Sequence, residues 1–152
     1  MANIDNPRGL EWAGNLYGGT GGAQAMHGLV GAGQTIAAGD PVVIDGGQLD
    51  LAAADPTNVY GVAQGAGTAG DEIEFIPALP GYLWRIQCTT LANTDIGGTC
   101  AFVAATGEFE ANTAVAGNGA LHIVRLDDTD TPENDYGDDA DAIVQIANTA
   151  WS

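Results

Sequence analysis

The sequence contains no lysine, and its one serine is the last residue, Ser152. A lysine nucleophile or Schiff base is therefore excluded, and a serine nucleophile set inside a site is excluded with it. Only two histidines are present, His27 and His122, and neither has a cysteine or serine close to it in sequence. We interpret both as packing or surface residues rather than catalytic bases. The sequence therefore predicts no catalytic residues, and we expect that the protein is not an enzyme.

Positive charge and long apolar runs are also scarce. Three arginines stand against 20 acidic residues, which gives a net charge of −17. Such a surface repels phosphate, so we expect neither nucleic acid nor an anionic membrane as a partner. No apolar run approaches the roughly 20 residues that span a bilayer. The opening residues, MANIDNPRGLEW, lack the basic and apolar regions of a secretory signal.

Candidate residues for a metal or cofactor site are few. The two cysteines, Cys88 and Cys100, have no zinc-site spacing, and two histidines do not complete one. We interpret them as small core residues, with a cross-strand disulfide as the alternative. The glycine-rich stretch GGTGGAQAMHG lacks the Gly-Lys-Ser/Thr ending of a phosphate-binding loop. We therefore predict no bound metal and no cofactor.

The sequence is rich in glycine, with 23 residues, and in apolar residues, which make up 45%. Over short stretches the apolar residues alternate with polar ones. The clearest local pattern lies in residues 38–52, AGDPVVIDGGQLDLA, where Gly46-Gly47 predicts a two-residue hairpin turn. If Asp45 lies opposite Gln48, four apolar side chains share one face of the hairpin. They are Val42, Ile44, Leu49 and Leu51.

Further segments show the same period of two. Ile73 and Phe75 face opposite to Glu72 and Glu74, and Pro77 limits that segment to a strand end or edge. Tyr82, Trp84, Ile86 and Cys88 share one face of the next segment, and Arg85 and Gln87 share the other. Other expected strands cover residues 59–63, 99–104, 120–126 and 141–147. No window predicts a long amphipathic helix, so we expect an all-β fold, a small β-barrel or β-sandwich-like domain.

Residues 1–35 show no regular period and are rich in Gly, Asn and small residues. We predict an extended Gly-rich N-terminal arm over residues 1–35 and a β-rich domain over residues 36–152. The four glycines of GGTGG keep this segment from forming a regular element alone. Apolar and aromatic side chains dominate the energy of interfaces, so Leu10, Trp12 and Tyr17 are the expected anchors of the arm.

The stretch TPENDYGDDAD, residues 131–141, places five carboxylates around one glycine. A calcium-binding EF-hand loop needs the order D-x-[DN]-x-[DN]-G, but the series from Asp128 reaches Pro132 and then Glu133 where glycine should be. An irregular calcium site stays open as an alternative. A pair of catalytic carboxylates would need a separation of about 5 to 9.5 Å across a cleft, which adjacent loop acids rarely supply. We interpret the stretch as a turn formed by Asn134 and Gly137, with solvated acids.

A set of short motifs follows in order along the whole chain: NPRGL, a Gly-rich hinge, AGDPVVI, GYLWRIQC, DIGGTC, LHIVRLDDTDTPENDYG and AIVQIAN. Near the end, Arg125-Leu126 closes a strand and residues 142–148 form the last one. The turn between these two strands carries Pro132, Asn134, Tyr136 and Gly137. This ordered set resembles a family of tailed-bacteriophage head decoration proteins, also called cement proteins.

The resemblance implies a small β-barrel protein, usually a homotrimer, on the outer surface of an icosahedral phage head. Its partners would be the major capsid protein and its own copies, and its location the virion, after the host cytoplasm during assembly. It would hold capsomers together against the pressure of packaged DNA. The capsid-binding residues of the arm would be Asn6, Pro7, Arg8, Gly9, Leu10, Trp12 and Tyr17. The alternative is a calcium-dependent carbohydrate or host-surface binding module.

Overall fold

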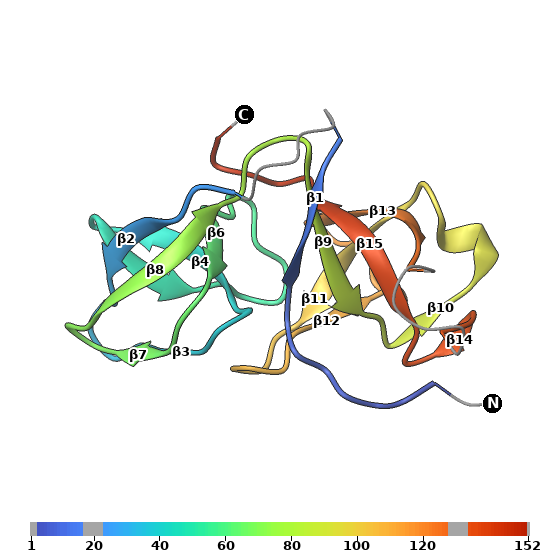
Figure 1. The fold of residues 1–152 in the computed structure, drawn as a ribbon, viewed down its shortest axis with the longest axis horizontal. Helices are drawn as coiled ribbons and strands as arrows, with labels where there is room; N and C mark the ends of the chain where they lie inside the picture. The colour runs from blue at the N-terminus through green and yellow to red at the C-terminus, as the bar shows by residue number, and fades with distance from the viewer. Residues whose placement is uncertain (1–2, 17–22, 128–133, 152) are drawn as a thin grey trace.

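The computed structural model describes residues 3–16, 23–127 and 134–151, and Figure 1 shows two groups of antiparallel strands side by side. The predicted all-β fold is confirmed. In the described residues, helical structure is limited to one 3-10 turn, η1 (Asn93–Asp95). None of the described helical structure is long and apolar enough to cross a membrane.

A five-stranded sheet with its short ribbon forms what we call the small lobe. Its strands lie in the order β2 (Met26–Leu29), β8 (Glu72–Pro77), β6 (Gly61–Ala63), β4 (Pro41–Asp45) and β5 (Gln48–Leu51). A parallel bridge between Val30 and Leu49 joins the two outer strands, so the sheet closes toward a barrel. The ribbon consists of β3 (Thr35–Ile36) and β7 (Gly67–Thr68).

The β4–β5 hairpin has the predicted register, with Asp45 opposite Gln48 and Val42 opposite Leu51. Gly46 and Gly47 both have positive φ, at 57° and 82°, which a turn of this type requires at its two central positions. Of the four side chains predicted to share a face, Val42 and Leu49 are fully buried and Leu51 is half-buried. Ile44, next to the turn, is exposed.

A six-stranded sheet with a second ribbon forms the large lobe. Its strands lie in the order β1 (Glu11–Asn15), β9 (Tyr82–Gln87), β15 (Asp141–Ile146), β13 (Leu121–Leu126), β11 (Thr99–Val103) and β12 (Glu110–Asn112). The ribbon consists of β10 (Thr90–Leu91) and β14 (Gly137–Asp138). A bridge between Cys88 and Ala111 links the end of β9 to β12. The sheet from β9 to β12 therefore curls on itself, and β1 lies outside this closure as an edge strand.

The main hydrophobic core fills the large lobe around Trp84, Phe102 and Phe109, which are fully buried. Val62 of β6 and Ile76 of β8 belong to the same cluster, so this core continues into the small lobe. A separate, smaller cluster that includes Val42, Leu49, Ile73 and Phe75 fills the interior of the small lobe. The predicted faces of β8 and β9 are confirmed, because the apolar side of each strand lies in a core.

Two AGD motifs form equivalent turns. Asp71 accepts the backbone N–H of Thr68 at 2.9 Å, and Asp40 accepts that of Ala37 at 2.9 Å. The buried Asp40 carboxylate also accepts the N–H of Gly107, in the large lobe, at 2.7 Å. Burial raises the pKa of Asp40, and these two N–H groups act in the opposite direction. Asp40 therefore ties the two lobes together.

The last residues cross from the large lobe back to the small lobe. Val59 and Thr149 form a bridge, and the N–H of Val59 donates to the Asn148 carbonyl at 2.8 Å. The Trp151 indole N–H donates to the Tyr60 carbonyl at 2.6 Å, with the two rings 4.8 Å apart. The chain thus joins the lobes near its C-terminal end as well as at Asp40.

The division into an arm over residues 1–35 and a β-rich domain over residues 36–152 stays a prediction, and the strand pairing shows how the two parts are joined. β1 pairs with β9 of the large lobe, and β2 pairs with β8 of the small lobe. In its described residues, the backbone of this segment is hydrogen-bonded into both sheets through β1 and β2. The prediction missed this because each partner strand lies far away along the chain.

Candidate functional site

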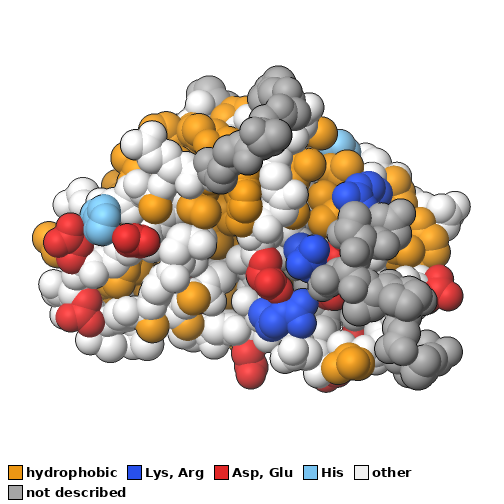
Figure 2. Space-filling view, in the orientation of Figure 1, with side chains coloured by type: hydrophobic (Ala, Val, Ile, Leu, Met, Phe, Trp, Pro, Cys, Tyr) orange, Lys and Arg blue, Asp and Glu red, His pale blue; other side chains and the backbone are white. Residues whose placement is uncertain are grey.

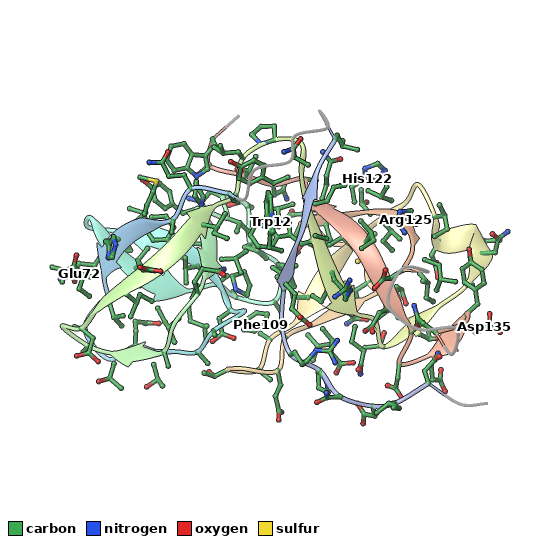
Figure 3. The ribbon with its side chains drawn as sticks, in the orientation of Figure 1. Trp12, Glu72, Phe109, His122, Arg125 and Asp135 are labelled. Atoms are coloured by element: carbon green, nitrogen blue, oxygen red, sulfur yellow. The ribbon has the colours of Figure 1, made fainter. Side chains whose placement is uncertain are left out.

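Asn3 fastens the start of the described chain to the large lobe. Its side-chain amide donates to the carbonyls of Asp135 at 2.8 Å and Asp138 at 2.9 Å, and its Oδ1 accepts the Asp135 N–H at 3.1 Å. The beginning of the chain therefore lies against the late acidic turn. Figure 3 shows Asp135 at the far end of the large lobe and Trp12 near the junction with the small lobe.

Gln87 forms the next attachment. This side chain is 3% exposed, and its Oε1 accepts the N–H of Asn6 at 2.8 Å. Its amide nitrogen faces three carboxylates, those of Asp5 at 3.0 Å, Glu110 at 3.4 Å and Asp139 at 3.4 Å. The motif NPRGL is thus anchored through the backbone N–H of Asn6, whose side chain is exposed.

Two of the carboxylates around Gln87, those of Glu110 and Asp139, have raised pKa values. Desolvation raises the pKa of Glu110, and nearby Asp5 and Asp139 raise it further, while the hydrogen bond from Gln87 lowers it. The pKa of Asp139 is also raised, by desolvation first and then by Asp5 and Asp138. Within the described ranges, no three His, Cys, Asp or Glu side chains form a group that could hold a metal ion.

Gly9 and Leu10 lie at the contact with the small lobe. Gly9 has φ of +75°, and a Cβ there would lie 2.5 Å from the carbonyl oxygen of Gly39. The N–H of Leu10 donates to that same oxygen at 2.9 Å, and its side chain is 2% exposed within the main core. Leu10, one of the predicted capsid anchors, is therefore covered by the core of this chain itself. Pro7, just before this contact, is half-buried.

Arg8 belongs to a network of charges on the outer face of β1, β9 and β15. Its Nε lies 2.6 Å from Glu11 Oε1, and its Nη2 lies 3.7 Å from Asp141 Oδ2. Burial raises the pKa of Asp141, and Arg8 lowers it. Arg85 forms a second ion pair here with the buried Asp127. Arg8 is 42% exposed, so it remains accessible to a partner.

The three arginines gather on this one face. Glu11 lies opposite Arg85 in the β1–β9 register, and Ile143 of β15 lies between Arg85 and Arg125. Figure 2 shows the blue side chains close together on this part of the surface. In a chain with a net charge of −17, this face concentrates the positive charge.

A groove of about 440 Å³ runs between the small lobe and what we call the opening segment, residues 3–16. Arg8, Leu10, Glu11 and Trp12 line one side, and Ala38, Gly39, Ala63 and Gln64 line the other. The Trp12 ring is half-buried and meets Tyr82 and Trp84 edge-on, with ring centroids 4.7 and 5.5 Å away. The structure therefore brings Arg8 and Trp12, two of the predicted arm residues, to one concave surface.

The late turn is a structural junction. Asn134 donates its amide to the carbonyls of Asp127 at 2.5 Å and Asp141 at 2.9 Å, and its Oδ1 accepts the Asp141 N–H at 2.9 Å. Gly137 opens β14 with φ of +132°. Tyr136 is exposed, and its hydroxyl lies 3.4 Å from Asn93 Oδ1. Asn134 thus holds the end of β13 to the start of β15.

Two predicted residues, Tyr17 and Pro132, lie outside the described residues. Two exposed apolar residues of the opening segment were not in the predicted set: Ile4 is 76% exposed and Leu16 is 55% exposed. The sequence carries a signal for Ile4, which is the one large apolar residue in the polar stretch ANIDNP. Exposed large apolar side chains on one segment are typical of an interaction surface.

Cys88 and Cys100 are free and buried in the main core. Desolvation raises the pKa of Cys100 to about 11 and raises that of Cys88 as well. Buried thiols with raised pKa values are poor nucleophiles. The interpretation of both as core residues is confirmed.

No model of a known protein family matches the chain, and no curated protein matches its sequence.

Proposed function

We propose that this chain is a structural protein of a tailed-phage head. It binds the outside of the icosahedral shell as a homotrimer and stabilises contacts between capsomers of the major capsid protein. The observation that carries the proposal is the convergence of the opening motif and the late turn. Asn3 contacts Asp135, and Arg8 reaches Asp141, so the two ends of the ordered motif set meet in one place.

The surface of the opening segment supports the same proposal. It carries the exposed Ile4 and Leu16 and lines the groove with Arg8 and Trp12. An interface of this kind uses a few apolar and aromatic anchors together with arginine. The acidic remainder of the chain suits a surface that faces away from packaged DNA.

Binding to phage heads that lack the protein tests the proposal. We expect the purified chain to sediment with such heads, and Arg8→Gln to weaken this binding by about 10-fold or more, as for the loss of one charge-assisted contact. We choose glutamine because a glutamate would add a third carboxylate beside Glu11 and Asp141. Arg125→Gln is the matched control, since it removes the same charge from the same face.

One result would contradict the proposal, and a second would contradict the role of Arg8. A chain that does not sediment with heads at any ionic strength is not a decoration protein. Equal weakening by both variants would show that net charge, and not the Arg8 contact, controls binding. Light scattering should give a mass near three 15.4 kDa chains, unchanged by EDTA. A change on chelation would favour the calcium-dependent alternative.

A further inference from the structure

The strand β1 leaves one backbone edge without a strand partner in the described sheet, since it is the outermost strand beyond β9. The Leu10 N–H points away from β9, because it donates to Gly39 of the small lobe. Alternate N–H groups of an extended chain point the same way, so the N–H and carbonyl of Trp12 also face away from β9. The register shift between Trp12 and Gly14 reverses this alternation. Accordingly, the Leu16 N–H points toward the β9 side, where it donates to the Gly81 carbonyl at 2.8 Å.

The edge of β1 faces the groove. The opposite wall consists of Ala38, Gly39, Ala63 and Gln64, and of these only Gln64 carries a long side chain. The two charges in the groove, Arg8 and Glu11, are paired with each other at 2.6 Å. The groove is therefore nearly neutral and mostly apolar, in a chain whose overall charge is −17.

We infer that the groove takes an extended, uncharged segment of the capsid shell protein, rich in small residues, which adds as a strand beside Trp12. Main-chain hydrogen bonds to a free strand edge supply affinity in such complexes, and side-chain pockets supply specificity. The charge balance of the groove selects this occupant, because Arg8 and Glu11 offset each other and a charged segment would lose hydration without meeting a net opposite charge. The remaining N–H groups of Arg8 can still donate to main-chain carbonyls of an uncharged segment. The contact of Leu10 with Gly39 is already a first pairing on this edge. The inference rests on the proposed function.

Hydrogen exchange measured by mass spectrometry, with and without heads that lack the protein, tests the inference. We expect exchange of a peptide that covers residues 11–15 to slow at least 10-fold on binding, while a peptide that covers β8 is unchanged. Ala38→Phe fills the groove from its far wall and should weaken head binding at least 10-fold. Ala32→Phe is the matched control, because Ala32 is also exposed in the small lobe but does not line the groove. Thermal unfolding confirms that both variants fold.

The outcomes separate this inference from the proposed function. If the chain binds heads, but residues 11–15 gain no protection and Ala38→Phe binds normally, the groove inference is wrong and the proposed function stands. If the chain does not bind heads, the proposed function fails, and the inference fails with it. If residues 11–15 become protected in concentrated protein without heads, the occupant is a second copy, which overturns the choice of the shell protein.

Discussion

The side chain of Asn134 holds the late turn together, so a single substitution there should lower the stability of the fold. Its side chain satisfies two carbonyls and one N–H at the junction of β13 and β15. In the sequence it was identified as a turn former, and the structure adds the three backbone partners that explain it. An asparagine amide offers donors and an acceptor together, which alanine lacks and aspartate only half retains.

We therefore predict that Asn134→Ala lowers the free energy of unfolding by about 1–3 kcal/mol, the cost of leaving partly buried polar groups unpaired. Urea unfolding followed by fluorescence measures the change. Asn58→Ala serves as the control, since Asn58 is exposed outside any strand. Equal stability of the two variants would contradict the structural role of the Asn134 amide.

At the scale of single elements, the hairpin of β4 and β5 was predictable down to its register. Its turn and its apolar alternation lie within 11 consecutive residues, from Pro41 to Leu51, so local sequence holds the whole pattern. β1 was not predictable in the same way. Its sequence EWAGN contains a glycine at an irregularity and pairs with a strand more than 60 residues away. The pairing of β1 with β9 therefore could not be predicted from local periodicity. The burial of Leu10, the residue just before β1, could not be predicted for the same reason.

The close approach of the opening segment to Gly39 of the small lobe depends on Gly9. We predict that Gly9→Ala destabilises the protein more than Gly33→Ala, although both residues have φ of +75°. A left-handed conformation costs a side-chain residue about 1–2 kcal/mol in each case. Only at Gly9 would the new Cβ also meet a backbone carbonyl, at 2.5 Å, whereas nothing lies within 4 Å at Gly33.

Thermal unfolding of the two glycine variants measures this difference directly. We expect a lower midpoint for Gly9→Ala, together with faster hydrogen exchange in residues 11–15, because β1 follows the close approach at Gly9. If the two variants unfold at the same temperature, the contact between Gly9 and Gly39 has no energetic role.

For the whole molecule, the charge balance predicts an unusual response to pH. Asp40, Glu110, Asp139 and Asp141 all have raised pKa values, with desolvation as the largest cause. The folded chain therefore binds these protons more tightly than the unfolded chain, whose carboxyls titrate near 3.8 to 4.5. This contribution to stability is full below those values and is lost as the pH rises through the folded-state pKa values.

We accordingly predict that the thermal midpoint at low salt rises when the pH falls from 7 to about 5. The same change reduces the repulsion among 20 acidic residues. Added salt at pH 7 should also raise the midpoint, since it screens that repulsion. Calorimetry at the two pH values measures the effect. A midpoint that is lower at pH 5 would mean that the ion pairs of Arg8 and Arg85 outweigh the four carboxyls with raised pKa values.

The placement of β1 also has a consequence for how the chain folds. Its ladder joins residue 11 to residue 85, and the whole small lobe lies between them in sequence. Contacts between distant residues carry a large loop-closure entropy and form late. The small lobe, with its local hairpin, can therefore form before the opening segment reaches β9. During synthesis, β1 leaves the ribosome before β9 and must wait for β9 before it can pair.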